Sequence, residues 1–197
     1  IRNCDWSSDV CSSDLIQGLM RGKNQRTRRG EPDPFGNRDA SREQRVHLLD
    51  QGLERDDDAV AEVAGAGVVV EVGEADVVLD CTDNFPSRFA LNEACIAMGT
   101  PLVSGAAIRW EGQIATFDPR DPGCPCYRCL YPDTGVEAAT CAMEGVIAPI
   151  VGVIGTMQAL ETLNVLLNTG EGLVGRVLMF DGIAMEWQSI HLGRNAD

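Results

Sequence analysis

A buried strand that ends in a polar corner is the feature of this sequence that most limits its fold. Asp76 to Phe89 reads DVVLDCTDNFPSRF, in which the apolar run Val77 to Leu79 leads into the turn-forming run Asp80 to Asn84. A short, continuously apolar run is typical of a parallel strand covered on both faces. In open α/β sheets, ligands bind beyond the carboxyl ends of such strands, so Asp83 and Asn84 are predicted to face a ligand cleft.

The sequence after this corner predicts a helix and then further strands. Pro86 suits the first turn of a helix, Arg88 to Met98 continues it, and Gly99-Thr100-Pro101 stops it. This strand, loop and helix unit indicates the α/β class. The remaining periodicity predicts strands at 102–108 and 112–118, a helix at 148–168, and a carboxyl-terminal β-hairpin made of 176–181 and 185–191.

Composition limits the partners of the chain. The 197 residues are 44% hydrophobic and 23% charged, which is ordinary for a globular domain, and the net charge of -14 argues against nucleic acid or an anionic membrane as the main partner. The apolar stretch 146–167 is interrupted by Gln158 and Glu161, so a buried helix is predicted there and not a membrane span. Three of the eight cysteines cluster at 124–129 and no signal peptide is visible, which favours a reducing, cytoplasmic compartment.

The amino-terminal part lacks the order of the rest. Residues 1–15 contain CDWSSDVCSSDL, which resembles the conceptual translation of a sequencing adapter, and we interpret this segment as a sequencing scar. Residues 16–62 are interpreted as a linker or an out-of-frame segment, with a possible helix between Ser41 and Arg55. The ordered domain is assigned to 63–197, and residues 1 to about 58 are expected to pack poorly against it.

Four consecutive blocks of the sequence carry a family resemblance. They read ADVVLDCTDNFPSRFALNEAC, TPLVSGAAIRWEGQI, PCYRCLYPD and GVIAPIVGVIGTMQALETL. From about Ala75 to Asn195 the chain resembles the carboxyl-terminal portion of the ThiF/MoeB/HesA family, relatives of ubiquitin-activating enzymes. The resemblance implies an adenylyltransferase that uses ATP and Mg²⁺ to activate the terminal glycine of a ubiquitin-like sulfur-carrier protein, for thiamine or molybdopterin synthesis. It also implies a homodimer when the protein is full length.

The chain departs from the family pattern in its nucleotide-binding half. It has no strand followed by a glycine-rich turn, no acidic residue for the ribose and no segment that supplies the phosphate-binding arginine. We therefore expect an incomplete Rossmann-like sheet and a fragment that is inactive alone. Two other classes stay open, namely a non-catalytic zinc-binding interaction module and a nicotinamide-dependent dehydrogenase.

The resemblance also assigns roles to residues of the polar corner. Asp83 takes the magnesium and catalytic role, and the nucleotide-binding residues are Asp83, Asn84 and Arg88. A hard cation needs an oxygen ligand, which the carboxylate of Asp83 supplies. The alternative is that Asp83 only caps the helix that follows it.

Three cysteines are candidates for metal or thiol chemistry. Cys126 and Cys129 form a Cys-x-x-Cys knuckle, half of a tetrahedral zinc site, and the resemblance places the missing pair just beyond Asn195. The alternatives are a thioredoxin-like redox pair and a substitute ligand from Cys124. The resemblance makes Cys141 a covalent acceptor of the activated glycine, while a small buried thiol without chemistry is the alternative.

Overall fold

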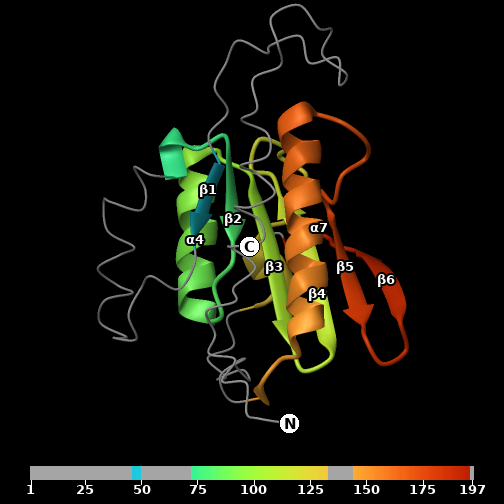
Figure 1. The fold of residues 1–197 in the computed structure, drawn as a ribbon. Helices are drawn as coiled ribbons and strands as arrows, with labels where there is room; N and C mark the ends of the chain where they lie inside the picture. Colours follow the sequence, from blue (N-terminus) through green and yellow to red (C-terminus); the bar gives the residue numbers. More distant parts are fainter. Residues whose placement is uncertain (1–45, 50–71, 133–143, 196–197) are drawn as a thin grey trace, which may run out of the picture.

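The computed structural model describes residues 46–49, 72–132 and 144–195 of the chain. The sequencing-scar interpretation of 1–15 and most of the 16–62 segment lie outside these residues. Within the described residues the fold is α/β, with one open mixed sheet between helices (Figure 1).

In the part of the chain that the structure describes, six strands form the sheet in the order of the sequence. The strands β1, β2 and β3 run parallel, and β4, β5 and β6 follow as antiparallel neighbours. Their bounds are β1 Val46–Leu49, β2 Val77–Asp80, β3 Leu102–Ile108, β4 Glu111–Phe117, β5 Arg176–Asp181 and β6 Glu186–His191. The last two strands form the predicted hairpin.

Helices cover both faces of the central strands. The helices α4 (Phe85–Met98) and α5 (Tyr127–Leu130) lie on one face, and α7 (Ala148–Leu167) crosses the other (Figure 1). Val78 belongs to the apolar cluster on the α4 side, whereas Val77 and Leu79 belong to the cluster on the α7 side. Every side chain of β2 is buried, which explains the apolar run Val77 to Leu79, and the strand ends in the buried carboxylate of Asp80.

The ends of α4 follow from local chemistry. Asn84 has an extended backbone, and its side-chain oxygen accepts a hydrogen bond from the Ser87 N–H at 2.9 Å. Pro86 occupies the first turn, where its missing N–H has no intrahelical partner to lose. Gly99 ends the helix with φ 71°, a left-handed conformation that glycine adopts without a steric penalty. The predicted start and stop of this helix are confirmed.

The long helix α7 is attached to the sheet by buried polar side chains. Gln158 donates from Nε2 to the carbonyl oxygen of Asp80 at 2.8 Å, and Glu161 accepts from the Thr116 hydroxyl at 2.9 Å. By length and composition α7 is apolar enough to cross a membrane. Because its polar side chains are buried against the sheet, we interpret it as a core helix. A Cβ added at Gly152 of this helix would meet no atom within 4 Å.

One predicted element is wrong. The helix proposed between Ser41 and Arg55 is a strand where the structure describes it, because Val46–Leu49 pairs in parallel register with β2. A segment of four residues is too short for its apolar spacing to distinguish a strand from a helix, so the pairing with β2 decides. The bounds predicted for β3 and β5 are confirmed, and those for β4 and β6 differ by one residue.

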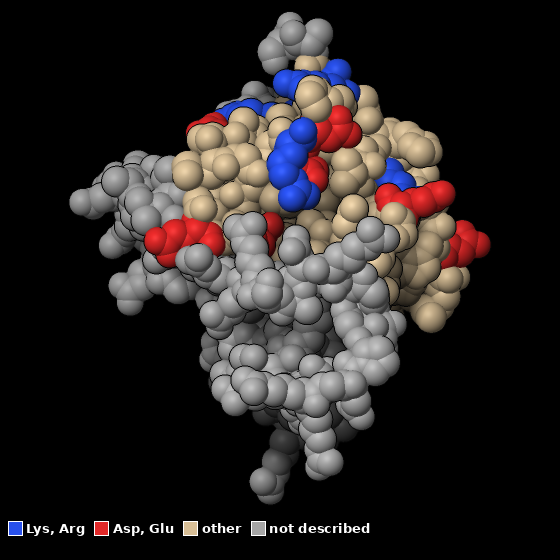
Figure 2. Space-filling view, turned by 90° about the horizontal axis from the view of Figure 1, so that it is seen from above, with Lys and Arg blue, Asp and Glu red and all other residues tan. Residues whose placement is uncertain are grey.

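The end of the molecule that holds Asp118 carries charges of both signs. Figure 2 views the molecule from above and shows Lys and Arg side chains next to Asp and Glu side chains over the described residues. Arg120, for example, contacts the Asp118 carboxylate at 2.6 Å. Among the described residues in this view, no broad basic surface of the kind that binds nucleic acid is visible.

Candidate functional site

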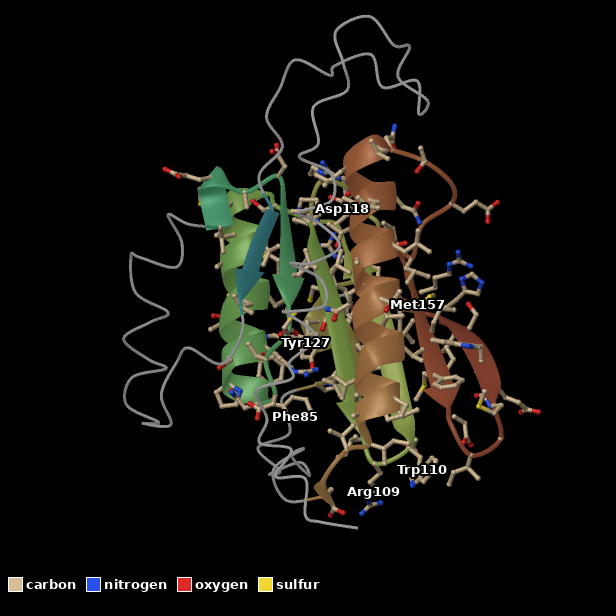
Figure 3. The ribbon with its side chains drawn as sticks, in the orientation of Figure 1. Phe85, Arg109, Trp110, Asp118, Tyr127 and Met157 are labelled. Carbon is tan, nitrogen blue, oxygen red and sulfur yellow. The ribbon has the colours of Figure 1, made fainter. Side chains whose placement is uncertain are left out.

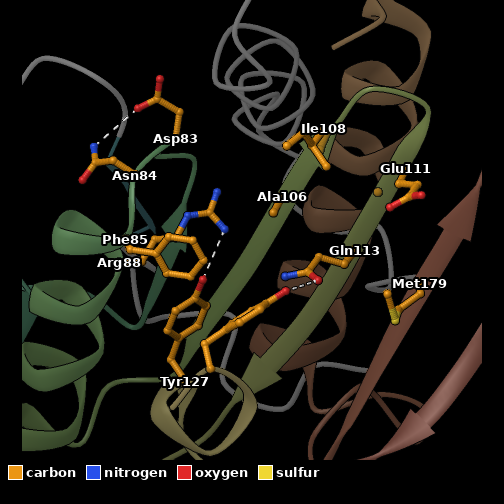
Figure 4. A pocket seen from close by; sticks show the side chains of 13 residues that line it. Asp83, Asn84, Phe85, Arg88, Ala106, Ile108, Glu111, Gln113, Tyr127 and Met179 are labelled. Atoms are coloured by element: carbon orange, nitrogen blue, oxygen red, sulfur yellow. Dashed lines mark hydrogen bonds between the residues drawn. The ribbon is translucent and has the colours of Figure 1, made fainter. Parts of the chain in front are cut away.

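A cavity opens beside the carboxyl ends of β2 and β3. Its volume is about 210 Å³, which is smaller than a pocket that encloses a whole nucleotide-sized ligand. It lies between the start of α4, the exposed face of the sheet and α5 (Figure 4). Its lining residues include Asp83, Asn84, Phe85, Arg88, Ala106, Ile108, Glu111, Gln113, Tyr127, Tyr131 and Met179.

The polar corner lies where the sequence predicted it. Asp83 and Asn84 are half-buried, follow the end of β2 and line the cavity (Figure 4). The Asn84 side-chain amide donates to Oδ1 of Asp83 at 3.4 Å, while Asn84 itself caps α4. Since the cap is provided by Asn84, the alternative that Asp83 caps this helix is wrong. Asp83 is therefore a lining residue of the cavity that does not cap α4.

Arg88 lies beneath the same corner and is 7% exposed. Its Nη2 donates to the Thr82 carbonyl oxygen at 2.5 Å and lies 3.4 Å from the Gly105 carbonyl oxygen. Its Nη1 lies 3.5 Å from the Tyr127 hydroxyl, a contact drawn in Figure 4. The guanidinium thus connects the loop after β2 with β3 and α5.

A buried carboxylate stands next to this guanidinium. Oδ1 of Asp80 accepts from the amide and the hydroxyl of Thr82 at 3.0 and 2.7 Å, and Oδ2 accepts from the Ser104 hydroxyl at 2.8 Å. Nε of Arg88 lies 3.9 Å from Oδ2 of Asp80. A buried charge needs such partners, and Asp80 has both hydrogen-bond donors and a cation.

Tyrosines from the cysteine loop form one wall of the cavity. Tyr127 and Tyr131 are four residues apart at the ends of α5, with ring centroids 5.3 Å apart. The Tyr131 hydroxyl donates to Oε1 of Gln113 on β4 at 2.6 Å (Figure 4). Burial raises the pKa of Tyr127 to about 12, although Arg88 opposes the shift, so this phenol is neutral at ordinary pH.

Sequence reasoning missed these wall residues. Two signals in the sequence were available, namely the four-residue spacing of Tyr127 and Tyr131 and the two-residue spacing of Glu111 and Gln113 on one face of β4. Figure 3 places Tyr127 and Phe85 near α4 and Met157 on α7, so the aromatic wall belongs to the α4 side of the sheet.

The predicted knuckle cysteines are adjacent. The sulfurs of Cys126 and Cys129 are 3.7 Å apart, and a tetrahedral zinc ion with Zn–S bonds of about 2.3 Å places two sulfurs at about this separation. The Asn195 N–H donates to the Cys129 sulfur at 3.4 Å, so the tail returns to the knuckle as predicted. Within the described residues, no group of three or more His, Cys, Asp or Glu side chains is arranged to hold a metal.

The cysteines differ in acidity. For Cys129, burial raises the pKa, but hydrogen bonds from Asn195 and Cys126 and the charge of Arg194 outweigh it, so the pKa falls below its usual value. Burial raises the pKa of Cys95 to about 12, and it also raises the pKa of Cys124. Cys124 accepts from the Asp118 N–H at 3.2 Å inside the protein. Cys141 lies outside the described residues.

Comparison with known families decides the affiliation. A family model described as the ThiF family matches residues 43–197. The chain belongs to the ThiF family. The match includes β1 and begins before Ala75, where the resemblance starts in the sequence.

The chain spans about half the length of the curated relatives that it matches. The chain is 48% identical over 124 residues to molybdopterin-synthase adenylyltransferase of Escherichia coli (strain K12), covering 63% of the chain and 49% of that protein. It is 42% identical over 133 residues to the sulfur carrier protein ThiS adenylyltransferase of the same organism, covering 67% and 52%. Both of these relatives are named adenylyltransferases, a kind of nucleotidyltransferase.

Solved structures share the fold. The E. coli MccB structure with succinimide superposes with a TM-score of 0.52 at 16% identity, covering 64% of the chain and 39% of that protein. The heterocyclase TruD superposes with a TM-score of 0.53 at 14% identity, covering 77% and 26%. At these identities the likeness concerns the fold alone.

Proposed function

We propose that this ThiF-family chain is part of an ATP-dependent adenylyltransferase for the carboxyl-terminal glycine of a ubiquitin-like sulfur-carrier protein. The observation that carries the proposal is the half-buried carboxylate of Asp83, which lines a cavity at the carboxyl end of β2. The names of the relatives support this reaction, and they leave both the thiamine and the molybdopterin branch open.

The reaction has electrostatic requirements that the corner meets. A carboxylate oxygen of the carrier attacks the α-phosphorus of ATP, the bond to the β-phosphate oxygen breaks, and pyrophosphate leaves. A bound Mg²⁺ would neutralise the charge that develops on the phosphate oxygens. Asp83 has the hard oxygen that such an ion requires, and the Asn84 amide is positioned by the helix cap to orient the nucleotide.

The cavity also suits the end of an extended peptide. Its volume of about 210 Å³ is too small for a folded domain, and Ala106 contributes only a methyl group to its floor. Aromatic rings of Phe85 and Tyr131, 5.3 Å apart, close one side. A glycine terminus without side chains fits such a narrow space.

Pyrophosphate exchange tests the function. We propose that the 197 residues alone bind ATP weakly, because no strand with a described continuation is followed by a glycine-rich turn. The test protein is therefore a chimera in which the amino-terminal half of the E. coli molybdopterin-synthase adenylyltransferase precedes residues 72–197. With a sulfur carrier, this chimera should exchange labelled pyrophosphate into ATP, and a carrier without its last glycine should not support exchange. Zinc binding without exchange would favour a non-catalytic interaction module instead.

Zinc is proposed at the knuckle. The sulfur separation of 3.7 Å between Cys126 and Cys129 fits a shared ion, and the lowered pKa of Cys129 favours the thiolate that binds metal. Two thiolates satisfy half of the coordination shell, so zinc content should rise when two further cysteines follow Asn195. Stoichiometric, chelator-resistant zinc in the 197-residue chain would contradict this.

Two further assignments stay proposals. We propose that Cys141 accepts the activated glycine, which a Cys141→Ser variant tests through loss of the covalent carrier adduct on gels. We also propose a homodimer, for which exposed Val153 and Leu160 on α7 offer apolar surface. Sedimentation of the wild type and of Leu160→Glu measures it.

A further inference from the structure

The guanidinium of Arg88 is engaged by the protein itself. Each of its three nitrogens is within reach of a protein oxygen, namely the carbonyls of Thr82 and Gly105, the Tyr127 hydroxyl and the Asp80 carboxylate. Only 7% of the residue is exposed. A guanidinium that binds a phosphate in two-pronged fashion must present free N–H groups to the ligand. Here the nitrogens of the guanidinium contact oxygens of the protein, on the loop after β2, on β2 and β3 and on α5.

The charge of Arg88 is also compensated. Asp80 is fully buried, and its carboxylate is oriented by Thr82 and Ser104 so that Oδ2 lies 3.9 Å from Nε of Arg88. An anion and a cation this close in a buried site offset one another's field. A phosphate in the cavity would therefore meet a paired arginine.

The pair holds the backbone on which Asp83 stands. The amide and the hydroxyl of Thr82 bond to Asp80, and the Thr82 carbonyl bonds to Arg88 at 2.5 Å. The peptide group that Arg88 contacts is the one that joins Thr82 to Asp83. The direction of the Asp83 carboxylate thus depends on a peptide whose carbonyl group is held by Arg88, directly after a residue, Thr82, whose amide and hydroxyl are held by Asp80.

We propose that Arg88 is a positioning residue, which together with buried Asp80 fixes the Thr82–Asp83 peptide, and that it does not bind the nucleotide phosphates. This assignment replaces the nucleotide-binding role that the family resemblance gives to Arg88. It deepens the proposed function, because the group that it positions is the metal-binding carboxylate of that site.

Hydrogen exchange of the full 197-residue chain tests the positioning. In Arg88→Lys, which keeps the charge and loses the planar fork, the amides of residues 82–84 should exchange about tenfold faster or more, as expected when a charged hydrogen bond is lost. The matched control is Arg128→Lys on α5, whose arginine pairs with Glu93 at the surface and should leave these amides unchanged. Unchanged exchange of residues 82–84 in folded Arg88→Lys would overturn the proposal.

A second variant covers the case in which Arg88→Lys does not fold. Ser104→Ala removes the donor that holds Oδ2 of Asp80, and it should raise exchange at residues 82–84 in the same direction by roughly threefold. If residues 82–84 of folded Ser104→Ala exchange like the wild type, the proposal fails.

Kinetics of the chimera separate positioning from phosphate contact. Positioning predicts that Arg88→Lys raises the Mg²⁺ concentration for half-maximal pyrophosphate exchange about tenfold, while KM for ATP at saturating Mg²⁺ stays within twofold. It also predicts that Arg88→Lys has no further effect once Asp83→Asn is present. A higher KM for ATP with unchanged Mg²⁺ dependence would show direct phosphate contact. If the parent chimera does not exchange at all, the proposed function fails, and the hydrogen-exchange result still decides the positioning of the peptide.

Discussion

Gly105 on β3 should not tolerate a side chain, because Gln158 of α7 fills the space beside it. A methyl group at Gly105 would overlap the amide carbon and oxygen of Gln158, which is 1% exposed. That amide donates from Nε2 to the carbonyl oxygens of Asp80 at 2.8 Å and Val103 at 3.3 Å. Gly105→Ala therefore forces Gln158 away from two buried carbonyls, one at the end of β2 and one near the start of β3.

The size of the effect follows from these contacts. A buried polar group left without its partner costs about 1–3 kcal/mol, and inserting a methyl into a filled core costs about 1–3 kcal/mol. A rotation of Gln158 would relieve the steric clash, but it would also break the two hydrogen bonds. The two costs are therefore not fully additive, and we expect the free energy of unfolding to fall by about 2–4 kcal/mol. Gly152→Ala on α7 is the control, since nothing lies within 4 Å of its added Cβ. This change should be neutral or stabilise by up to about 1 kcal/mol.

Urea unfolding followed by circular dichroism measures both variants and a double-mutant cycle. In a Gln158→Ala background the methyl at Gly105 has room, so the cost of Gly105→Ala should fall below about 1 kcal/mol. Equal costs in both backgrounds, or a cost below about 1 kcal/mol in the wild-type background, would refute the reasoning.

Further predictions concern the corner and the thiols. Asn84→Ala should lose about 1 kcal/mol in urea unfolding, whereas Asn84→Asp keeps the cap oxygen and should lose less, and equal losses would argue against the cap. At pH 8 iodoacetamide should modify Cys129 while Cys95 stays unmodified, because its pKa of about 12 leaves the buried thiol protonated. Mass spectrometry that finds Cys95 modified first would contradict this. Cys129→Ser should lower zinc content in the chain extended by two cysteines, and Cys124→Ser should not.

The parts of the fold that were predicted from the sequence are those with local causes. The apolar run of β2, Pro86 and Gly99 mark their elements by residue type alone, and the structure follows them. The strand β1 was not predicted, because its extended conformation depends on pairing with β2 and not on the types of its own four residues. Long-range pairing of this kind leaves no local periodicity to read.

Some residues of the candidate site were also predictable from the sequence, and others were not. Asp83 and Asn84 follow directly from the position of a polar turn after a buried strand, and both line the cavity. The contacts of Arg88 were not predictable, because they depend on Gly105 and Tyr127, which lie 17 and 39 residues away in the sequence. Only the folded chain brings the loop, the strand and α5 together around one guanidinium.

The central claim is that the carboxylate of Asp83 supports adenylylation, and pyrophosphate exchange in an Asp83→Asn variant tests it most directly. The change keeps the size of the side chain and removes its charge, so the chimera should lose roughly a hundredfold in exchange rate. Glu93→Gln, an equivalent loss of charge at an exposed position of α4, should exchange within about twofold of the parent. Exchange by Asp83→Asn within threefold of the parent would contradict the account.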